Sequence, residues 1–575
     1  MRIVHVLLFP FVAASAAFAG EAVDPRIRTF VDPVRVVWQS EPSRHGERSK
    51  VSGAEILLGR KHGQVPELGW ERLSDGCILE NDGENPALLL DFGRELHGGL
   101  RLSFGDGCRR ARVRICLGES VSEALSSVGG KTATNDHAVR DDTVEIPSFG
   151  VLEFGQTGFR FARISLETPG RVVLQSARAV SLMRPMKAVG SFCSSDGRLN
   201  RIFETAIRTV HLCCQDYLWD GIKRDRLVWM GDTHPETMAI LNVFGAMPIL
   251  PETLAYAAET TPIGTWMNRM PTYTLWWIRN LAAWYRYAGD KAFLERQADY
   301  LEKTFDFVSS AVDAQGKWTQ DAFLDWPTRH NKVAEAAGTQ GLLLLTARET
   351  VLLAKALGRD GFVERASRLA SRLEKVDAQP AGEKSAAALL ALSGLQDPQE
   401  MYRRVLSCRG HEGVSTFYGY YMLEAMSAAD QDQRALDTVR DYWGGMLDVG
   451  ATSFWEDFNL SWTNACFRID ELPVPGKTDV HGDYGEFCYS GFRHSLCHGW
   501  SAGPAAWCIG HVLGIRPMDV GCKTVEVRPF LGDLAWARGA MALPTGEKVS
   551  VEVRKMTDGT LESKVTAPTW VRIVR

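Results

Sequence analysis

The chain has 575 residues, of which 45% are hydrophobic and 23% charged, and its formal net charge is -5. This length predicts about three or four structural units, and the composition excludes a disordered chain and a membrane bundle. Because the charge is nearly balanced and the sequence contains no Lys/Arg-rich run, we expect neither nucleic acid nor an anionic membrane surface as a partner. The 17 Trp residues suit stacking on the apolar faces of sugars, although packing in the core explains most of them.

Residues 1–19 have the pattern of a secretory signal peptide. Met1-Arg2 precedes the apolar run IVHVLLFPFVAASAAFA, and Ala17-Phe18-Ala19 gives the small-x-small pattern that precedes cleavage. We therefore expect a periplasmic or secreted protein. The run is too short for a comfortable membrane span, and no later segment approaches the roughly 20 apolar residues that a spanning helix needs.

The 12 cysteines are scattered without the CxxC spacing of metal sites, so we expect no metal. An oxidising compartment would permit disulfides. The pair Cys488 and Cys497, at either end of one short loop, is the candidate.

Residues 20–190 predict an N-terminal antiparallel β-sandwich. Apolar and polar residues alternate in ALLLDF (87–92), RVRICL (112–117) and FRFARISL (159–166), with turn signals at short intervals. Such a domain often supports or gates the site of a neighbouring domain. Two polar stretches, GESVSE (118–123) and TNDHAVRD (134–141), could reach that site, although exposed surface loops are the more ordinary expectation.

The periodicity changes to that of a helix after Ser195, where Asp196 can cap the first turn and apolar residues recur at helical spacing from Leu199 to Val210. Further helices are expected near 236–245, 271–288, 291–312, 338–357, 360–375, 385–393, 398–408, 415–428, 431–447 and 498–513. This gives about eleven helices, and twelve lies within the uncertainty of the boundaries. Six helical hairpins over residues 191–515 predict an all-α (α/α)6 toroid core. The strands KTVEVRPF and KVSVEVRK then predict a C-terminal antiparallel β-sandwich over 516–575.

Acidic residues concentrate in WDGIKRDRLVWMGDTHPE (219–236), which contains Asp220, Asp225, Asp232 and Glu236. Carboxylates that lie close together raise one another's pKa, and an apolar wall raises it further, so that one of them can act as a general acid. The alternative is a structural salt-bridge network, with Asp232 or Thr233 capping the helix that Pro235 begins.

Three other segments without periodicity carry candidate residues. GATSFWEDFNLSW (450–462) places Glu456 and Asp457 between aromatic residues, where a carboxylate can activate water beside a sugar platform. FLDWPTRHN (323–331) offers Asp325 and Trp326 for a hydroxyl and a stacking contact. The stretch from Val480 contains several histidines, but their spacing matches no zinc motif, and we expect contacts to sugar hydroxyls or hydrogen bonds in the core instead.

The segment DGIKRDRLVWMGD resembles the signature of the family 78 α-L-rhamnosidases, with Asp220, Asp225 and Asp232 at matching spacing. GATSFWE (450–456) looks like the family's second element, whose Glu is the general base, and Cys497-His498 aligns with its later Asn-His element. The resemblance covers about residues 190–515. Two positions depart from the pattern, because Asp225 stands where the family has Glu, and Cys497 where it has Asn.

The resemblance implies an inverting glycoside hydrolase that releases terminal α-L-rhamnose, or a related sugar, from oligosaccharides or polysaccharides. Asp225 is then the general acid and Glu456 the general base, acting without a cofactor or metal. Because Asp is one methylene shorter than Glu, either the substrate differs from a simple rhamnoside or Asp232 or Glu236 supplies the proton. The residues expected to bind the sugar are Asp220, Arg224, Trp229, Asp232, Asp325, Trp326, Trp455, His498 and Trp500.

Two other functions stay open at this point. Hydration of unsaturated uronides on a similar toroid often relies on Asp as the acid, which fits Asp225. The protein could also be a non-catalytic glycan-binding component that keeps the cleft. The sequence does not predict an oligomeric state.

Overall fold

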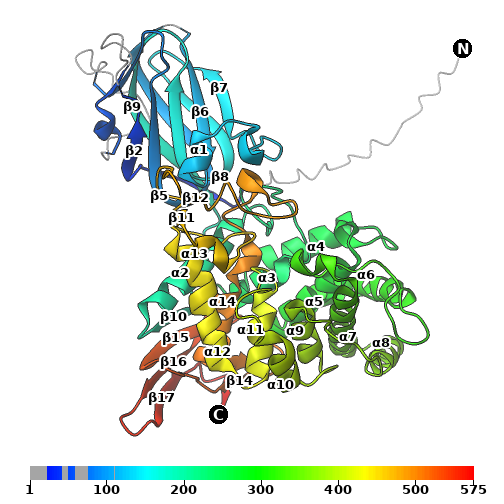
Figure 1. Ribbon diagram of the computed structural model, residues 1–575. Helices are drawn as coiled ribbons and strands as arrows, with labels where there is room; N and C mark the ends of the chain where they lie inside the picture. Colours follow the sequence, from blue (N-terminus) through cyan, green and yellow to red (C-terminus); the bar gives the residue numbers. More distant parts are fainter. Residues whose placement is uncertain (1–22, 42–49, 59–74, 109) are drawn as a thin grey trace, which may run out of the picture.

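The computed structural model describes residues 23–41, 50–58, 75–108 and 110–575, so the signal peptide expected at 1–19 lies outside the described residues. An N-terminal sheet domain stands at one end of the molecule, and a helical part with smaller sheets beside it forms the rest (Figure 1). Within the described ranges, no helix combines the length and the apolar character that crossing a membrane requires.

The N-terminal domain is a nine-stranded sheet with the strand order β3-β4-β9-β5-β8-β6-β7, in which β1 pairs with β9 and β2 with β5. All of these pairings are antiparallel, as the alternating pattern predicts. Its inward residues form a hydrophobic core separate from that of the helical part. The strands are β1 (Ile27–Val31), β2 (Arg35–Gln39), β3 (Lys50–Ser52), β4 (Cys77–Asn81), β5 (Ala87–Gly107), β6 (Arg112–Gly118), β7 (Asp141–Glu145), β8 (Val151–Leu166) and β9 (Gly170–Met183).

A short helix, α1 (Val121–Leu125), follows β6 and lies at the end of the sheet that faces the helical part (Figure 1). Its N-cap is Ser120, whose hydroxyl accepts a hydrogen bond from the backbone N–H of Glu123 at 3.1 Å. The predicted polar stretch 118–123 is therefore the turn into α1. This turn meets the helical part directly, because Val121 N–H donates to the carbonyl of Ile469.

Helices dominate from residue 197 to about residue 512, as predicted. Asp196 caps the first of them by accepting hydrogen bonds from the N–H groups of Arg198 and Leu199. The helices are α2 (Gly197–Cys213), α3 (Thr233–Val243), α4 (Ile249–Thr260), α5 (Pro271–Ala288), α6 (Lys291–Ser310), α7 (Lys332–Ala356), α8 (Asp360–Leu373), α9 (Lys384–Ser393), α10 (Pro398–Met401), α11 (Gly419–Ala428), α12 (Asp432–Thr438), α13 (Gly444–Asp448) and α14 (Gly503–Trp507).

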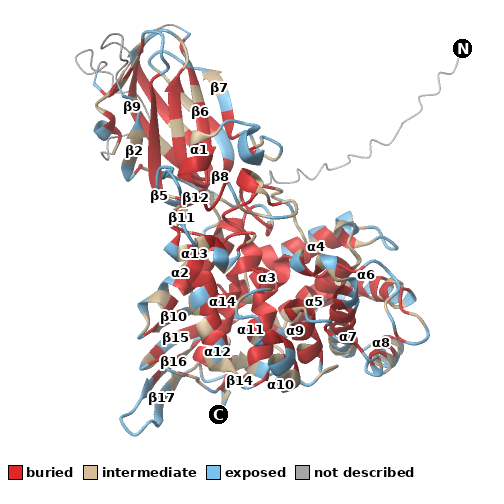
Figure 2. Ribbon diagram, viewed as in Figure 1, coloured by how far each residue is buried: buried red, intermediate tan, exposed pale blue. Residues whose placement is uncertain are grey.

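Helix α4 is the one that the sequence pattern did not predict, and its first turn contains Pro251, which reads as a break. Figure 2 shows the most buried helices, among them α3, α5, α7 and α9, running through the middle of the helical part, with more exposed helices such as α8 outside them. The N-terminal ends of α3 and α5 lie beside the candidate site, a pocket that Asp232 and Tyr273 both line.

The C-terminal strands pack against the helices rather than forming an isolated core. Strand β10 (Ser191–Ser194) precedes α2 in the chain but pairs with β15 (Trp536–Ala542), which continues into β16 (Lys548–Lys555) and β17 (Leu561–Thr566). Strands β13 (Ile515–Pro517), β14 (Thr524–Val527) and β18 (Arg572–Val574) form a second small sheet. Val551 and Val553 of β16 belong to the same core as the helices.

Candidate active site

One pocket of about 410 Å³ gathers most of the site residues predicted from the sequence. Nine of them line it, namely Asp220, Arg224, Asp225, Trp229, Asp232, Trp326, Glu456, His498 and Trp500. They come from four segments that are far apart in the chain. Met270, Tyr273, Phe323, Cys488 and Tyr489 complete the wall.

The loop between α2 and α3 carries the first carboxylates and has an unusual backbone. Asp225 and Arg226 both have positive φ angles, 52° and 56°. Consecutive residues other than glycine in the left-handed region are uncommon, and such conformations cluster at functional sites. Arg226 holds the turn from outside by donating to the carbonyls of Gln156, at 2.8 Å, and His137.

Arg224 joins the two carboxylates that the sequence singles out as acid and base. Its Nη2 donates to Oε1 of Glu456, and its Nη1 lies 3.8 Å from Oδ1 of Asp225. Although burial works against the charge, Glu456 and Asp225 raise the pKa of Arg224 above its ordinary value. Asp225 and Glu456, more than 200 residues apart in sequence, therefore face the same guanidinium in one pocket.

Glu456 is buried and held from three sides. Its Oε2 accepts a hydrogen bond from the backbone N–H of Ser495 at 3.2 Å, and its own N–H donates to the Ser495 carbonyl at 3.0 Å. The indole N–H of Trp500 donates to the carbonyl of Glu456 at 3.0 Å. Asp225 keeps 20% of its side chain exposed and is the more accessible carboxylate of the pair.

Asp220, Asp232 and His498 form a second polar group on the pocket wall. Nε2 of His498 lies 3.1 Å from Oδ2 of Asp232, and the hydroxyl of Tyr273 donates to Oδ1 of the same carboxylate at 2.9 Å. Burial raises the pKa of both Asp220 and Asp232. Burial opposes the charge on His498, but Glu456, Asp232 and Asp220 together raise the pKa of its imidazole. The group therefore favours a protonated histidine among carboxylates.

Asp220, Asp232 and His498 could also hold a metal ion, because each offers a ligand atom within 4.8 Å of the others. However, the hydrogen bond between His498 and Asp232 places a proton between two of the three ligand atoms, whereas metal binding requires both to be deprotonated.

Glu236 is a close neighbour of Asp220 and Asp232 but does not line the pocket. It is fully buried, burial raises its pKa well above the ordinary value, and neither oxygen has a hydrogen-bond partner among the described residues. A Cβ built on Gly499 would lie 1.7 Å from Oε1 of Glu236, so only glycine allows the backbone after His498 to approach this carboxyl.

Asp325 and Trp455, both expected to contact the sugar, lie outside the pocket wall. Asp325 accepts hydrogen bonds from the hydroxyls of Ser385 at 2.6 Å and Ser415 at 2.9 Å, and from the N–H of Thr328 at 3.1 Å. It therefore ties its own segment to the start of α9 and to the residues before α11. Trp455 is fully buried and packs edge-on against Phe458. Their sequence neighbours Trp326 and Glu456 take the positions that face the pocket.

The expected disulfide between Cys488 and Cys497 is wrong. All twelve cysteines fall within the described residues and all are free thiols. Cys488 lines the pocket, and its Sγ interacts with Arg224. Cys497 is fully buried and interacts with the thiol of Cys213 on α2. The two thiols therefore occupy different environments, one at the pocket and one in the core.

The other histidines of the 480–500 stretch form buried hydrogen bonds. Nε2 of His494 accepts from the N–H of Asp457 at 3.0 Å, and burial lowers the pKa of His494 well below its ordinary value. His481 bonds to Ser120 through Nδ1 at 2.8 Å and to the His494 carbonyl through Nε2 at 3.0 Å. These contacts match the hydrogen bonds expected from the sequence.

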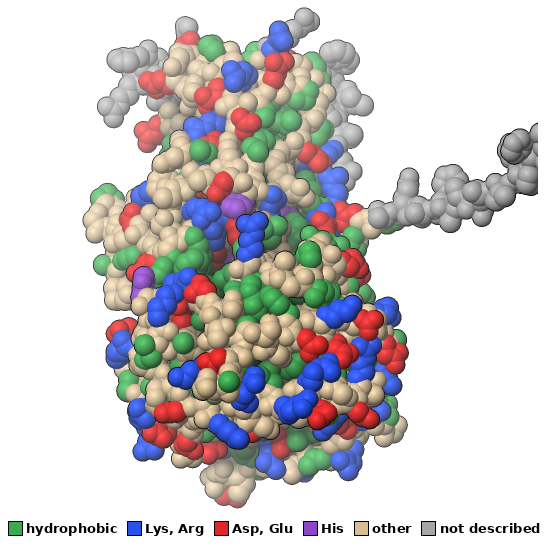
Figure 3. Space-filling view, turned by 90° about the vertical axis from the view of Figure 1, so that its right-hand side faces the viewer, with side chains coloured by type: hydrophobic (Ala, Val, Ile, Leu, Met, Phe, Trp, Pro, Cys, Tyr) green, Lys and Arg blue, Asp and Glu red, His purple; other side chains and the backbone are tan. Residues whose placement is uncertain are grey.

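The N-terminal sheet domain supplies side chains that the sequence did not assign to the site. Nε2 of His137 lies 3.4 Å from Oδ1 of Asp225. His137 also lines a smaller cavity of about 280 Å³, which shares Arg224 with the main pocket. Figure 3 shows the surface hollowed at the boundary between the two parts of the molecule, with histidine and Lys/Arg side chains at its edge. In the sequence, the polar composition of residues 118–123 and 134–141 suggested that these stretches could reach the site. It did not predict which residues of the helical part they contact.

Comparison with known proteins finds a family match for the first part of the helical region. Residues 187–380 match the family described as the bacterial α-L-rhamnosidase six-hairpin glycosidase domain. A search of curated protein sequences finds no match.

Solved structures share the fold over most of this chain. The GH78 family rhamnosidase of Bacillus sp. GL1 is 21% identical and superposes with a TM-score of 0.72, covering 86% of this chain and 54% of its own. The rhamnosidase from Klebsiella oxytoca, solved with rhamnose bound, is 18% identical with a TM-score of 0.64, covering 84% of this chain and 96% of its own. The α-L-rhamnosidase of Streptomyces avermitilis, complexed with L-rhamnose, is 16% identical with a TM-score of 0.65, covering 87% and 50%.

The chain is thus GH78-like in fold, and residues 187–380 match the six-hairpin glycosidase domain. Antiparallel sheets stand on either side of the helical part, together with one small sheet in which β14 and β18 run parallel. It spans about half the length of several of the rhamnosidases it resembles, and nearly the whole length of the Klebsiella oxytoca protein.

Proposed function

We propose that the protein is an inverting glycoside hydrolase that removes terminal α-L-rhamnose, or a closely related sugar, from oligosaccharides or polysaccharides. The observation that carries the proposal is the convergence of Asp225 and Glu456 on Arg224 in one pocket. Their helical scaffold would be an (α/α)6 toroid with a β-sandwich on either side, the architecture that the six-hairpin match supports.

In this mechanism Asp225 protonates the glycosidic oxygen while Glu456 removes a proton from the attacking water. The bond from the anomeric carbon to the leaving group breaks as the bond to the water oxygen forms on the opposite face. Inversion requires the two carboxyl groups to stand about 6.5–9.5 Å apart, which leaves room for the water. Asp225 is the partly exposed carboxylate, as an acid that must meet a leaving group requires.

The remaining pocket residues suit a sugar with several hydroxyls. Asp220 and Asp232 offer acceptors, while the buried Nε1 of Trp229 and Nδ1 of His498 have no hydrogen-bond partner among the described residues. Trp326 and Trp500 give the wall flat apolar surfaces, on which sugar rings pack. Unpartnered donors beside aromatic faces are the usual composition of a site that orients a small polar ligand.

The first test is a screen of aryl glycosides, with the α-L-rhamnoside first, for the wild-type protein and for Asp225→Asn and Glu456→Gln. We expect release of rhamnose by the wild type, loss of most turnover in the folded Glu456→Gln variant, and in Asp225→Asn a loss that is large only where the leaving group needs a proton. Loss of ultraviolet absorbance from an unsaturated oligosaccharide, without rhamnose release, would instead identify a uronide hydratase. Calorimetric binding of oligosaccharide without turnover would identify a glycan-binding protein.

We further propose that the protein is exported to the periplasm or secreted, on the pattern of residues 1–19. Mass spectrometry of the mature N-terminus in the exported fraction tests this. An intact Met1 in the cytoplasmic fraction alone would contradict it.

A further inference from the structure

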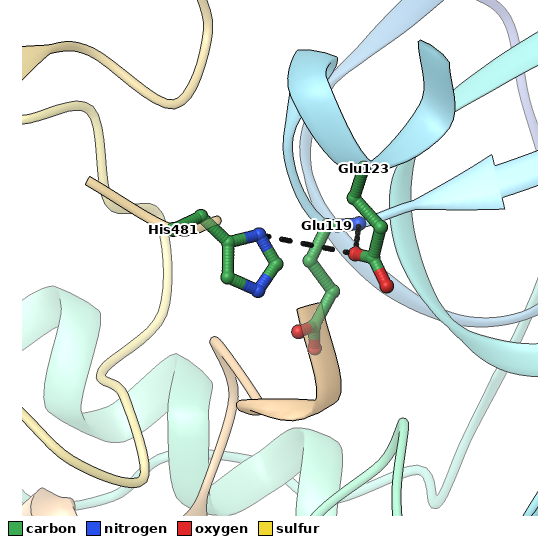
Figure 4. A group of neighbouring side chains, drawn as sticks. All are labelled: Glu119, Glu123 and His481. Carbon is green, nitrogen blue, oxygen red and sulfur yellow. Dashed lines mark hydrogen bonds and ion pairs between the residues drawn. The ribbon is translucent and has the colours of Figure 1, made fainter. Parts of the chain in front are cut away.

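Two carboxylates of the N-terminal sheet domain are fully buried at its boundary with the helical part. Glu119 and Glu123 lie at the start of α1, where Oε2 of Glu123 accepts a hydrogen bond from the N–H of Glu119 at 2.8 Å. Figure 4 shows His481, from the helical part, with its ring directed toward this pair. Nδ1 of His481 lies 4.0 Å from Oε2 of Glu123. Burying two acids side by side is costly unless a positive charge or hydrogen bonds compensate.

Lys223 supplies that positive charge from the loop between α2 and α3. Its ammonium lies 3.0 Å from Oε2 of Glu119 and 3.1 Å from Oε1 of Glu123. The three residues Glu119, Glu123 and His481 have the spacing of a metal site. The ammonium already occupies the position between the carboxylates, so they need no ion. Lys223 immediately precedes Arg224 in the chain. The contacts that hold Lys223 therefore also position the backbone at Arg224.

The same ammonium also holds the segment from Phe492 to His494. Lys223 donates to the carbonyl of His494 at 2.6 Å and to that of Phe492 at 2.9 Å. Glu119 completes the attachment, because its Oε2 accepts from the N–H of Leu496 at 2.6 Å. One carboxylate thus binds both the loop at 223 and the segment at 496.

That segment is the one that orients Glu456. Between Lys223's contact at His494 and Glu119's contact at Leu496 lies Ser495, whose N–H donates to Oε2 of Glu456 at 3.2 Å. The pairing is reciprocal, since Glu456 N–H donates to the Ser495 carbonyl. The hydroxyl of Ser495 itself lies 3.5 Å from Oε1 of Glu119. A displacement of residues 495–496 would therefore move the carboxylate of Glu456.

We propose that Glu119 is a positioning residue for the base Glu456. Through Glu119, the N-terminal sheet domain contributes to the geometry of the active site. This rests on the hydrolase function proposed above. Glu119 does not line the pocket and acts through Leu496 and Ser495 on one side and through Lys223 and Arg224 on the other. An error of about 1 Å in the placement of a reacting group can cost on the order of 100-fold in rate.

The test compares Glu119→Ala with two matched variants. Glu119→Gln keeps an oxygen that can accept from Leu496, and Glu123→Gln removes an equally buried charge from the same ammonium while leaving the contact at Leu496. We expect kcat to fall about 10- to 100-fold in Glu119→Ala with KM within about threefold, because the base acts in the transition state. Glu119→Gln should recover most of the loss, and Glu123→Gln should stay within about fivefold of wild type.

Amide hydrogen exchange across residues 494–498 gives a second reading that does not depend on turnover. We expect faster exchange at Ser495 and Leu496 in Glu119→Ala, with circular dichroism showing a folded protein at the assay temperature. Unchanged exchange at these amides, or an equal fall in kcat for Glu123→Gln and Glu119→Ala, would overturn the positioning role. A wild-type protein without glycosidase activity would refute the proposed function instead, and the exchange comparison would still decide whether Glu119 holds the segment.

Discussion

Nε2 of His137 lies 3.4 Å from Oδ1 of Asp225, although the two residues belong to different domains. The neighbouring Arg226 reinforces the contact by donating to the carbonyl of His137. The proposed acid is therefore presented on a turn that the sheet domain holds, with its backbone in the left-handed region. This support explains how Asp225 can act as the acid where the family that the sequence resembles has Glu. The backbone of the turn, rather than the length of the side chain, sets the position of the carboxyl group.

Replacement of Asp225 by Asn should depend on the leaving group. An acid contributes about 100- to 10,000-fold to a step in which the leaving oxygen needs a proton. We expect a loss of that size for an alkyl or sugar leaving group, and a much smaller loss for an activated aryl group that departs as an anion. Steady-state kinetics over a series of aryl α-L-rhamnosides measures this. An equal loss across the series would show that Asp225 does not deliver the proton.

Arg224→Lys should lower kcat by about 10- to 100-fold, because the single nitrogen of lysine cannot take the positions of both Nη2 at Glu456 and Nη1 facing Asp225, which the planar guanidinium fills together. The matched control is Arg329→Lys, which changes an arginine that pairs with Asp321 and Glu335 outside the pocket. Kinetic constants and thermal unfolding of both variants separate the effects. Comparable kcat values in the two variants would mean that the bridging geometry of Arg224 is dispensable.

Asp325→Ala should destabilise the protein with little effect on sugar binding. The substitution leaves the buried hydroxyls of Ser385 and Ser415 and the N–H of Thr328 without their acceptor. We expect the free energy of unfolding to fall by about 2–4 kcal/mol. In contrast, Trp326→Ala should raise KM, because Trp326 faces the pocket. Denaturant titration and KM for Asp325→Ala and Trp326→Ala test the contrast. Asp325→Asn is a second, more stable variant at the same position. A raised KM in Asp325→Asn would show that Asp325 binds the sugar.

His511 provides a pH-dependent contribution to stability away from the site. Burial opposes its charge, but Glu424 at 3.2 Å and Asp432 at 3.5 Å raise the pKa of His511 to about 9. Because the folded-state pKa exceeds the unfolded value of about 6.5, the contribution is complete below about pH 6.5 and is lost as the pH rises through about 9.

We therefore expect His511→Gln to cost about 2–3 kcal/mol at pH 6 and progressively less toward pH 10. Denaturant unfolding of wild type and variant over this range measures the difference. A constant difference between the two proteins from pH 6 to pH 10 would show that His511 stays in one protonation state throughout.

The sequence predicts the elements well where a local pattern sets them. Asp196 and the apolar spacing after it define α2, and the alternation in 87–92 and 159–166 defines β5 and β8. Helix α4 was missed because Pro251 in its first turn looks like a break. Strand β10 could not be assigned to the C-terminal sheet, because its partner β15 lies more than 300 residues away.

For the candidate site as well, local sequence patterns were informative, whereas contacts between distant residues could not be predicted. Acidic residues next to aromatic ones drew attention to both Asp325-Trp326 and Trp455-Glu456, but only one of each pair faces the pocket. Which of the two neighbouring residues faces the pocket depends on the backbone conformation of the loop. A loop has no periodic pattern from which that conformation could be predicted. The contacts of Glu119 and His137 depend on how two domains meet, and only the three-dimensional structure shows them.

The stereochemistry of the first product tests the central claim most directly. Proton NMR during hydrolysis of an α-L-rhamnoside records the anomer that appears before mutarotation. Single displacement by water between Asp225 and Glu456 predicts that β-L-rhamnose appears first and the α anomer only later. Initial release of α-L-rhamnose would require a covalent intermediate and would contradict the assignment of Glu456 as a base that activates water.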